Sequence, residues 1–75
     1  MTQDTNTLFT LKGEYIALDQ LLKVLGWVGS GGEAHAAVEA GRVWVDGQCE
    51  KRKRAKIRSG QRVRMEGEEV RVQGA

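Results

Sequence analysis

The fold is decided by residues 30–47, which read SGGEAHAAVEAGRVWVDG. Within this stretch a helical period gives way to a strand period and then to a tight turn. Ser30-Gly31-Gly32-Glu33 forms a capping box, with serine at the N-cap and glutamate three residues later. Small apolar residues then recur at helical spacing: Ala34, Ala37, Val38 and Gly41. Their size predicts a helix that packs closely against a neighbour.

The second part of the stretch predicts a strand and a hairpin. In Arg42-Val43-Trp44-Val45 the two valines share one face, and Trp44 points to the other. Asp46-Gly47 follows and is the strongest short turn signal in the chain.

An earlier helix is predicted by a stripe of leucines at i, i+3, i+4 and i+7: Leu18, Leu21, Leu22 and Leu25. Asp19 lies in its first turn, where a carboxylate meets the positive end of the helix dipole. Gly26 is placed to end this helix in a left-handed conformation. Before it, residues 8–11 (LFTL) predict a short strand.

The remaining segments predict short strands separated by turns. Ser59-Gly60 is a turn, and residues 62–65 (RVRM) alternate between arginine and apolar side chains. A turn over Glu66–Glu69 leads to a last strand containing Val70 and Val72. We therefore predict an α+β fold in which two short helices pack on a small, mostly antiparallel sheet with a β-hairpin.

Length and composition limit the function. The 75 residues predict a single domain with a core over residues 8–73, and residues 1–6 are expected to be disordered. Cys49 is the only cysteine and His35 the only histidine, so neither a disulfide nor a metal site is expected. The polar N-terminus and short apolar runs predict a cytoplasmic protein without membrane contact. A domain this small leaves little room for an enclosed pocket, so we expect neither an enzyme nor a cofactor.

The net charge of +2 conceals a strong asymmetry. Residues 1–41 carry two basic and five acidic side chains, a net charge of −3, whereas residues 42–75 carry ten and five, a net charge of +5. Six of the eight residues 51–58 (KRKRAKIR) are basic. Because such a cluster repels itself, it favours a polyanionic partner.

Two segments are candidates for phosphate contacts. If residues 51–58 are extended, Arg52, Arg54, Lys56 and Arg58 share one face and Ile57 points inward; the alternative is a solvated run of charge. At Ser30-Gly31-Gly32, unpaired helix amides and small residues would suit a phosphate, whereas the alternative is capping and loop flexibility alone.

Single residues are more ambiguous. His35 follows Ala34 and lies off the apolar stripe, so we favour an exposed helix position over a phosphate or base contact beside the helix start. Glu39 is its only acidic neighbour at helical spacing, which argues against a catalytic base. Trp44 either stacks on a base or, as we favour, packs under a basic side chain. Trp27 is expected to fill the corner between the helices. Two further groups of cations either extend the basic surface or remain solvated and locally paired: Lys12, Lys23 and Arg42, and Arg62, Arg64 and Arg71.

The combined pattern resembles the S-four-like RNA-binding domain, a family named after a ribosomal small-subunit protein. The resemblance covers residues 8–73 and rests on Leu18-Asp19, Ser30, Ala34, Gly41, residues 43–47 and residues 59–63. Residues 9–16 (FTLKGEYI) and 30–34 resemble its small stand-alone bacterial branch. The resemblance implies an αL motif, in which two helices and a β-hairpin form an RNA-facing surface. Members often carry arginine where Gly31 stands, and backbone amides would replace that contact here.

We therefore predict a monomer that binds structured RNA, either ribosomal RNA, transfer RNA or a folded precursor, through phosphate contacts, with the ribosome as one site of action. A module that docks an acidic protein is the alternative, and DNA binding is a weaker one. The predicted contacts converge in one cradle and comprise Ser30, Gly31, Gly32, His35, Arg42, Lys51, Arg52, Lys53, Arg54, Lys56 and Arg58.

Overall fold

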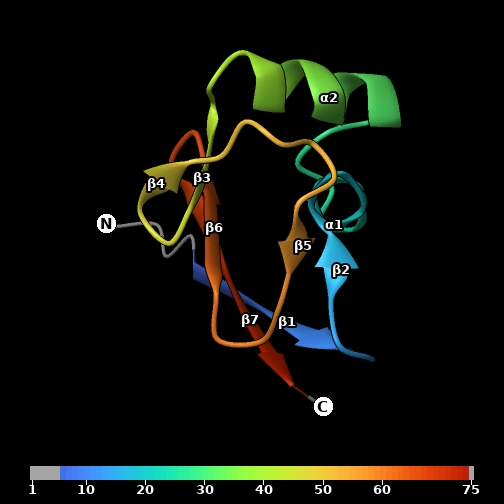
Figure 1. Cartoon of the computed structure of the whole chain (residues 1–75), viewed down its shortest axis with the longest axis vertical. Helices are drawn as coiled ribbons and strands as arrows, with labels where there is room; N and C mark the ends of the chain where they lie inside the picture. Colours follow the sequence, from blue (N-terminus) through green and yellow to red (C-terminus); the bar gives the residue numbers. More distant parts are fainter. Residues whose placement is uncertain (1–5, 75) are drawn as a thin grey trace, which may run out of the picture.

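The computed structural model describes residues 6–74. Its elements are β1 (Asn6–Leu11), β2 (Ile16–Ala17), α1 (Leu18–Val24), α2 (Gly31–Glu39), β3 (Val43–Val45), β4 (Gln48–Cys49), β5 (Lys56–Ile57), β6 (Arg62–Met65) and β7 (Glu68–Gly74). The two helices lie toward one end of the molecule and the long strands β1 and β7 toward the other (Figure 1). The predicted α+β class is confirmed. Of the segment expected to be disordered, residues 1–5 lie outside the described residues, whereas Asn6 begins β1.

The main sheet has five strands in the order β1-β7-β6-β3-β4. Its pairs are antiparallel except for β1 and β7, which run parallel, with Leu8 opposite Arg71. Strands β2 and β5 form a separate antiparallel pair that joins Ile16 to Ile57. Neither of these two long-range pairings was predicted, because local periodicity carries no information about a strand's partner.

Two tight turns set the hairpins of this sheet. Asp46 and Gly47 have φ values of 51° and 83°, and Glu66 and Gly67 have 50° and 88°. Two consecutive positive φ values match a type I′ turn, whose twist suits a hairpin. The predicted Asp46-Gly47 turn is confirmed, but the later turn is shorter than predicted, since Glu68 and Glu69 already belong to β7.

The helix ends follow the predicted chemistry with two differences. Gly26 has a φ of 76° and ends α1, and the Ser30 hydroxyl accepts a hydrogen bond from the Glu33 amide at 3.2 Å. The Glu33 carboxylate, however, accepts from the Gly29 amide at 2.6 Å, one residue before the N-cap. Gly41 was predicted within the helical stripe, which is wrong: α2 ends at Glu39, and Gly41 has a φ of 79°.

The core lies between the helices and one face of the sheet. Inward side chains of β3, β6 and β7 pack with the α1 leucines and with small residues of α2. Trp27 is partly buried against this core, in agreement with its predicted corner position. The same alternation turns Trp44, Arg62, Arg64 and Arg71 outward. Within residues 6–74 no helix combines the length and apolar character that crossing a membrane requires.

Candidate nucleic-acid interface

The segment over residues 51–58, here called the basic loop, is not one extended strand. A turn occupies Lys53 and Arg54, where the Ala55 amide donates to the Arg52 carbonyl at 3.2 Å, and only Lys56–Ile57 form a strand. The predicted single face running from Arg52 to Arg58 is therefore wrong at its start. The alternation does hold from Arg54 onward, since Ala55 and Ile57 are buried whereas Arg54, Lys56 and Arg58 are exposed.

The loop bends because its carbonyls cap α1. The N-cap residue of α1 is Ala17, which has no side chain to accept a hydrogen bond. Instead the Leu18 amide donates to the Ala55 carbonyl at 2.8 Å, and the Asp19 amide donates to the Lys53 carbonyl at 3.0 Å. These two bonds satisfy helix amides that would otherwise lack partners, and they hold the loop backbone in place.

The basic loop then runs alongside α2, in the direction opposite to that helix. Lys51 lies beside Gly41, where its Cε is 3.7 Å from the position that a Cβ would take. Lys53 Nζ is 3.4 Å from a carboxylate oxygen of Glu39. The connection between β4 and β5 is seen passing next to α2 in Figure 1. The basic loop therefore lies along one face of α2 and the turn that follows this helix.

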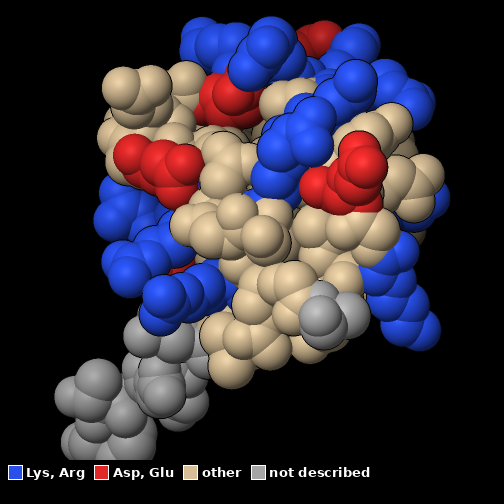
Figure 2. Space-filling model, turned by 60° about the horizontal axis from the view of Figure 1, so that its bottom comes forward, with Lys and Arg blue, Asp and Glu red and all other residues tan. Residues whose placement is uncertain are grey.

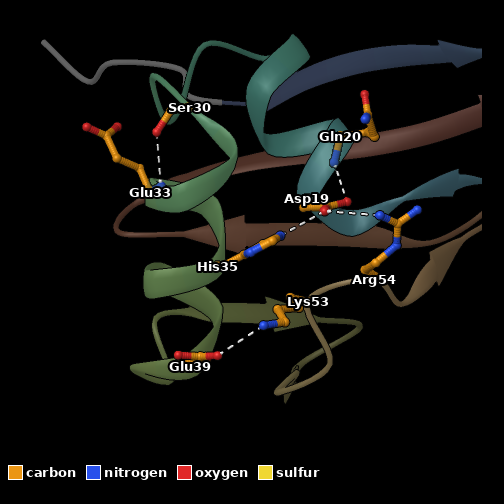
Figure 3. A network of polar contacts seen from close by, with 8 residues as sticks. All are labelled: Asp19, Gln20, Ser30, Glu33, His35, Glu39, Lys53 and Arg54. Carbon is orange, nitrogen blue, oxygen red and sulfur yellow. Dashed lines mark hydrogen bonds and ion pairs between the residues drawn. The ribbon is translucent and has the colours of Figure 1, made fainter.

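At the far end of this contact, one carboxylate joins three elements. Asp19 Oδ2 is 3.0 Å from His35 Nε2 and 4.0 Å from Arg54 Nη1, while its Oδ1 accepts from the Gln20 amide at 2.8 Å (Figure 3). Burial of Asp19 acts to raise its pKa, but the hydrogen bonds from His35 and the Gln20 amide, together with the charge of Arg54, hold that pKa below its ordinary value.

This contact corrects the favoured interpretation of His35. Its side chain is 37% exposed and is anchored to α1 rather than being a free surface group. Sequence reasoning missed the partner because Asp19 lies sixteen residues away, beyond any helical spacing. The arrangement joins both helices and the basic loop through a single buried acid.

Arg52 also pairs with an acidic residue, Glu50. Its guanidinium donates to both oxygens of Glu50, at 3.0 and 3.3 Å, and its amide donates to the same carboxylate at 2.9 Å. The hydrogen bond from the Arg52 side chain is the main reason why the pKa of Glu50 lies below its ordinary value. In the described part of the chain, Lys51, Lys56 and Arg58 form no ion pair with an acid.

The side chains at the start of α2 do not face the basic loop. Those of Ser30 and Glu33 point away from the side on which His35 meets Asp19, so the predicted convergence with the basic loop in one cradle is not observed for them (Figure 3). The Ser30 hydroxyl and the Glu33 carboxylate both hold amides at this helix end. A phosphate bound at Gly31 and Gly32 would thus lie near the negative charge of Glu33.

Other cations lie apart from the basic loop. Arg42 Nε donates to Glu66 at 2.6 Å, which links the residue before β3 to the second hairpin turn. The Arg64 guanidinium carbon is 5.9 Å from the centroid of the Trp44 ring, so the favoured interpretation, Trp44 under a basic side chain, is confirmed. Figure 2 shows lysines and arginines along the top of one face and in separate groups at its sides.

Sequence reasoning did not single out Tyr15 as a site residue. The structure places its ring beside Lys56 and Arg58, whose charged groups lie 5.0 and 5.7 Å from the ring centroid. The pairing of β2 with β5 creates this contact, and no local pattern signals it.

The fold and this surface define a known class of small domain. Residues 9–73 match the S4 domain family, and the chain belongs to that family.

Within it, the chain is similar to YbcJ of Escherichia coli strain K12 and to YbcJ of Shigella flexneri. It is 46% identical to each over 61 residues, which span 81% of this chain and 87% of each relative. A solution structure of YbcJ from E. coli matches with a TM-score of 0.67 and 40% identity, over 97% of this chain and 91% of that one. That structure is described as revealing an αL motif involved in RNA binding. The predicted bacterial branch and αL motif are therefore confirmed.

Proposed function

We propose that this protein binds structured RNA, such as ribosomal RNA, transfer RNA or a folded precursor, mainly through phosphate contacts from the basic loop. Membership of the S4 domain family and the RNA-binding motif described for YbcJ support this proposal. The six cations over residues 51–58 supply the charge that a phosphate backbone requires.

One observation carries the proposal: the loop backbone is fixed while its charged side chains remain exposed. Two hydrogen bonds from α1, at 2.8 and 3.0 Å, hold the loop carbonyls. The side chains of Arg52 and Arg54 nevertheless remain 80% and 72% exposed. A loop held in advance loses less conformational entropy when RNA binds.

The proposed contacts fall into two groups. Lys51, Lys56 and Arg58 can meet phosphates directly, whereas Arg52, Lys53 and Arg54 exchange an acidic partner for a phosphate. The pairs of Arg52 with Glu50 and of Lys53 with Glu39 are exposed, and such pairs contribute only about 0–1 kcal/mol. Arg54 lies 4.0 Å from the buried Asp19, and its own side chain is mostly exposed, so it can reach a phosphate. We assign secondary contacts to Ser30, Gly31, Gly32, His35 and Arg42. Because these are mainly phosphate contacts, recognition depends on RNA shape more than on base sequence.

A salt titration tests the proposal. Affinity for fluorescently labelled transfer RNA and for a ribosomal RNA fragment is measured as salt increases. Each neutralised phosphate should add about −0.7 to −0.9 to the slope of log affinity against log salt. The double change Arg52→Gln with Arg54→Gln should reduce that slope more than Arg62→Gln with Arg71→Gln, which removes equal charge from the outer sheet face. No binding, or a flat salt response, would contradict the electrostatic mechanism.

We also propose that the protein works as a cytoplasmic monomer of one domain, in association with the ribosome, without catalytic activity, cofactor or metal. Its single cysteine, Cys49, is exposed and unbridged, as suits a reducing compartment. Sedimentation of cell extracts through sucrose gradients tests the association, which predicts co-migration with ribosomal particles that ribonuclease treatment abolishes.

Docking of an acidic protein is a second candidate. Three carboxylates of the chain already lie against loop cations, from Glu39, Glu50 and Asp19, so the loop accepts carboxylates as well as phosphates. Pull-down with and without ribonuclease separates the two functions. Partners that persist after ribonuclease treatment favour the protein partner.

A further inference from the structure

Tyr15 occupies the connection between β1 and β2, and the residue remains 45% exposed. The antiparallel register of Ile16 with Ile57 places Tyr15 beside Arg58. Lys56 lies two residues from Arg58 and therefore projects from the same face of β5. The two charged groups lie 5.0 and 5.7 Å from the ring centroid, within cation–π range.

The ring also forms one wall of an open hollow of about 400 Å³. The lining residues are Phe9, Thr10, Leu11, Lys12, Tyr15 and Ile16. The site thus combines an exposed aromatic side chain and apolar neighbours with two cations, Lys56 and Arg58, that lie against the ring. A planar, apolar-faced group that carries an adjacent negative charge fits this combination.

Lys56 links the Tyr15 ring to the basic loop. It contacts that ring and lines a second hollow of about 520 Å³ together with Arg52, Arg54 and Ala55. A phosphate backbone held at the basic loop would therefore reach Tyr15 through Lys56.

We propose that Tyr15 stacks on an unpaired base of the bound RNA, while Lys56 and Arg58 hold a phosphate next to that base. This inference rests on the proposed RNA-binding function and adds a site for single-stranded nucleotides to it. A base fits better than an apolar protein segment, because such a segment would have to desolvate Lys56 and Arg58 without providing a partner for them. On phosphate binding, the cations shift from the ring to the stronger charge-assisted contact.

The experiment compares two RNA probes: a stem closed by an adenine-rich loop, and the same stem as a loop-free duplex. Stacking contributes about 1–3 kcal/mol per base, which corresponds to about 5- to 150-fold in affinity. Tyr15→Leu should weaken binding of the stem-loop by that factor and leave duplex binding and the salt slope unchanged. Tyr15→Phe keeps the aromatic face and should bind like the wild type.

Each other outcome separates the two proposals. Wild-type protein that binds neither probe overturns RNA binding itself. Equal weakening of both probes by Tyr15→Leu assigns the ring a role only in supporting the cations and overturns the stacking site. If the leucine variant does not fold, as judged by circular dichroism, the wild type is titrated with the stem-loop and observed by NMR. Stacking shifts the Tyr15 ring resonances upfield, and unchanged resonances overturn the proposal.

Discussion

The imidazole Nε2 of His35 in α2 lies 3.0 Å from Oδ2 of Asp19 in α1. The same oxygen faces Arg54 of the basic loop, and the Asp19 amide donates to the loop carbonyl of Lys53 at 3.0 Å. Asp19 is only 6% exposed, so its contacts are shielded from water. One buried residue thus positions the basic loop relative to both helices.

Asp19→Asn preserves the size of this side chain but removes its charge. We expect the free energy of unfolding to fall by about 1–3 kcal/mol, because hydrogen bonds to a charged group are lost in a buried place. Urea denaturation near neutral pH measures the change. Glu14→Gln is the matched control, since Glu14 is exposed and forms no ion pair within residues 6–74. If the Asn variant and the wild type are equally stable, the contacts of the Asp19 carboxylate do not contribute to the free energy of unfolding.

The pH dependence of this loss has a defined sign. The pKa of Asp19 is lower in the folded state, so the unfolded chain takes up its proton first as the pH falls. The contribution of Asp19 is therefore complete above its ordinary pKa of 3.8 and is lost as the pH falls through the folded value. The stability difference between wild type and Asp19→Asn should shrink in that acidic range. A difference that stays constant down to about pH 2 contradicts this linkage.

Glu50→Gln should strengthen RNA binding. Glu50 holds the Arg52 guanidinium through two contacts, at 3.0 and 3.3 Å, that a phosphate must displace. Replacing the carboxylate weakens that competition, which at an exposed pair is worth about 0.2–1 kcal/mol, or up to about five-fold in affinity. Fluorescence anisotropy with transfer RNA at low salt measures the gain. Weaker binding would mean that Glu50 instead holds Arg52 in its RNA-binding position.

Glu33→Gln tests the start of α2. The Gln side-chain oxygen can still accept from the Gly29 amide, but the negative charge beside Gly31 and Gly32 disappears. Loss of the favourable charge–dipole interaction should lower stability by about 0.3–1 kcal/mol. If these amides meet a phosphate, RNA affinity should rise, whereas Glu68→Gln on β7 should change it less. Unchanged affinity removes the helix start from the proposed contacts.

Asp46→Asn tests the first hairpin turn. Asp46 accepts hydrogen bonds at both oxygens, from the Arg62 amide at 3.0 Å and from the Gln61 side chain at 3.1 Å. Asparagine tolerates the positive φ but offers one oxygen, so the exchange should cost about 1 kcal/mol. Asp46→Ala should cost more, because it removes both acceptors. Thermal unfolding that ranks the three proteins in another order contradicts this account.

The two helices, the end of α1, the start of α2 and the first hairpin turn could be read from the amino-acid sequence alone. The leucine stripe of α1, the serine cap of α2 and the Asp46-Gly47 turn are local features, and each was predicted from residues a few positions apart. The concentration of charge over residues 51–58 was equally visible, as was the resemblance to the S4 domain family. The serine cap and the Asp46-Gly47 turn follow from backbone preferences and short-range hydrogen bonds, which depend little on the rest of the chain.

Which distant segments meet became visible only in the folded chain. The parallel pairing of β1 with β7, the contact of His35 with Asp19 and the position of Tyr15 beside Lys56 were not predicted. The bend of the basic loop was not predicted either. Ala17 has no side-chain acceptor at the start of α1, so the first amides of that helix donate to carbonyls of the loop instead. The physical reason is that strand partners and ion pairs depend on how the whole chain packs, whereas periodicity reports only which face of each element is buried.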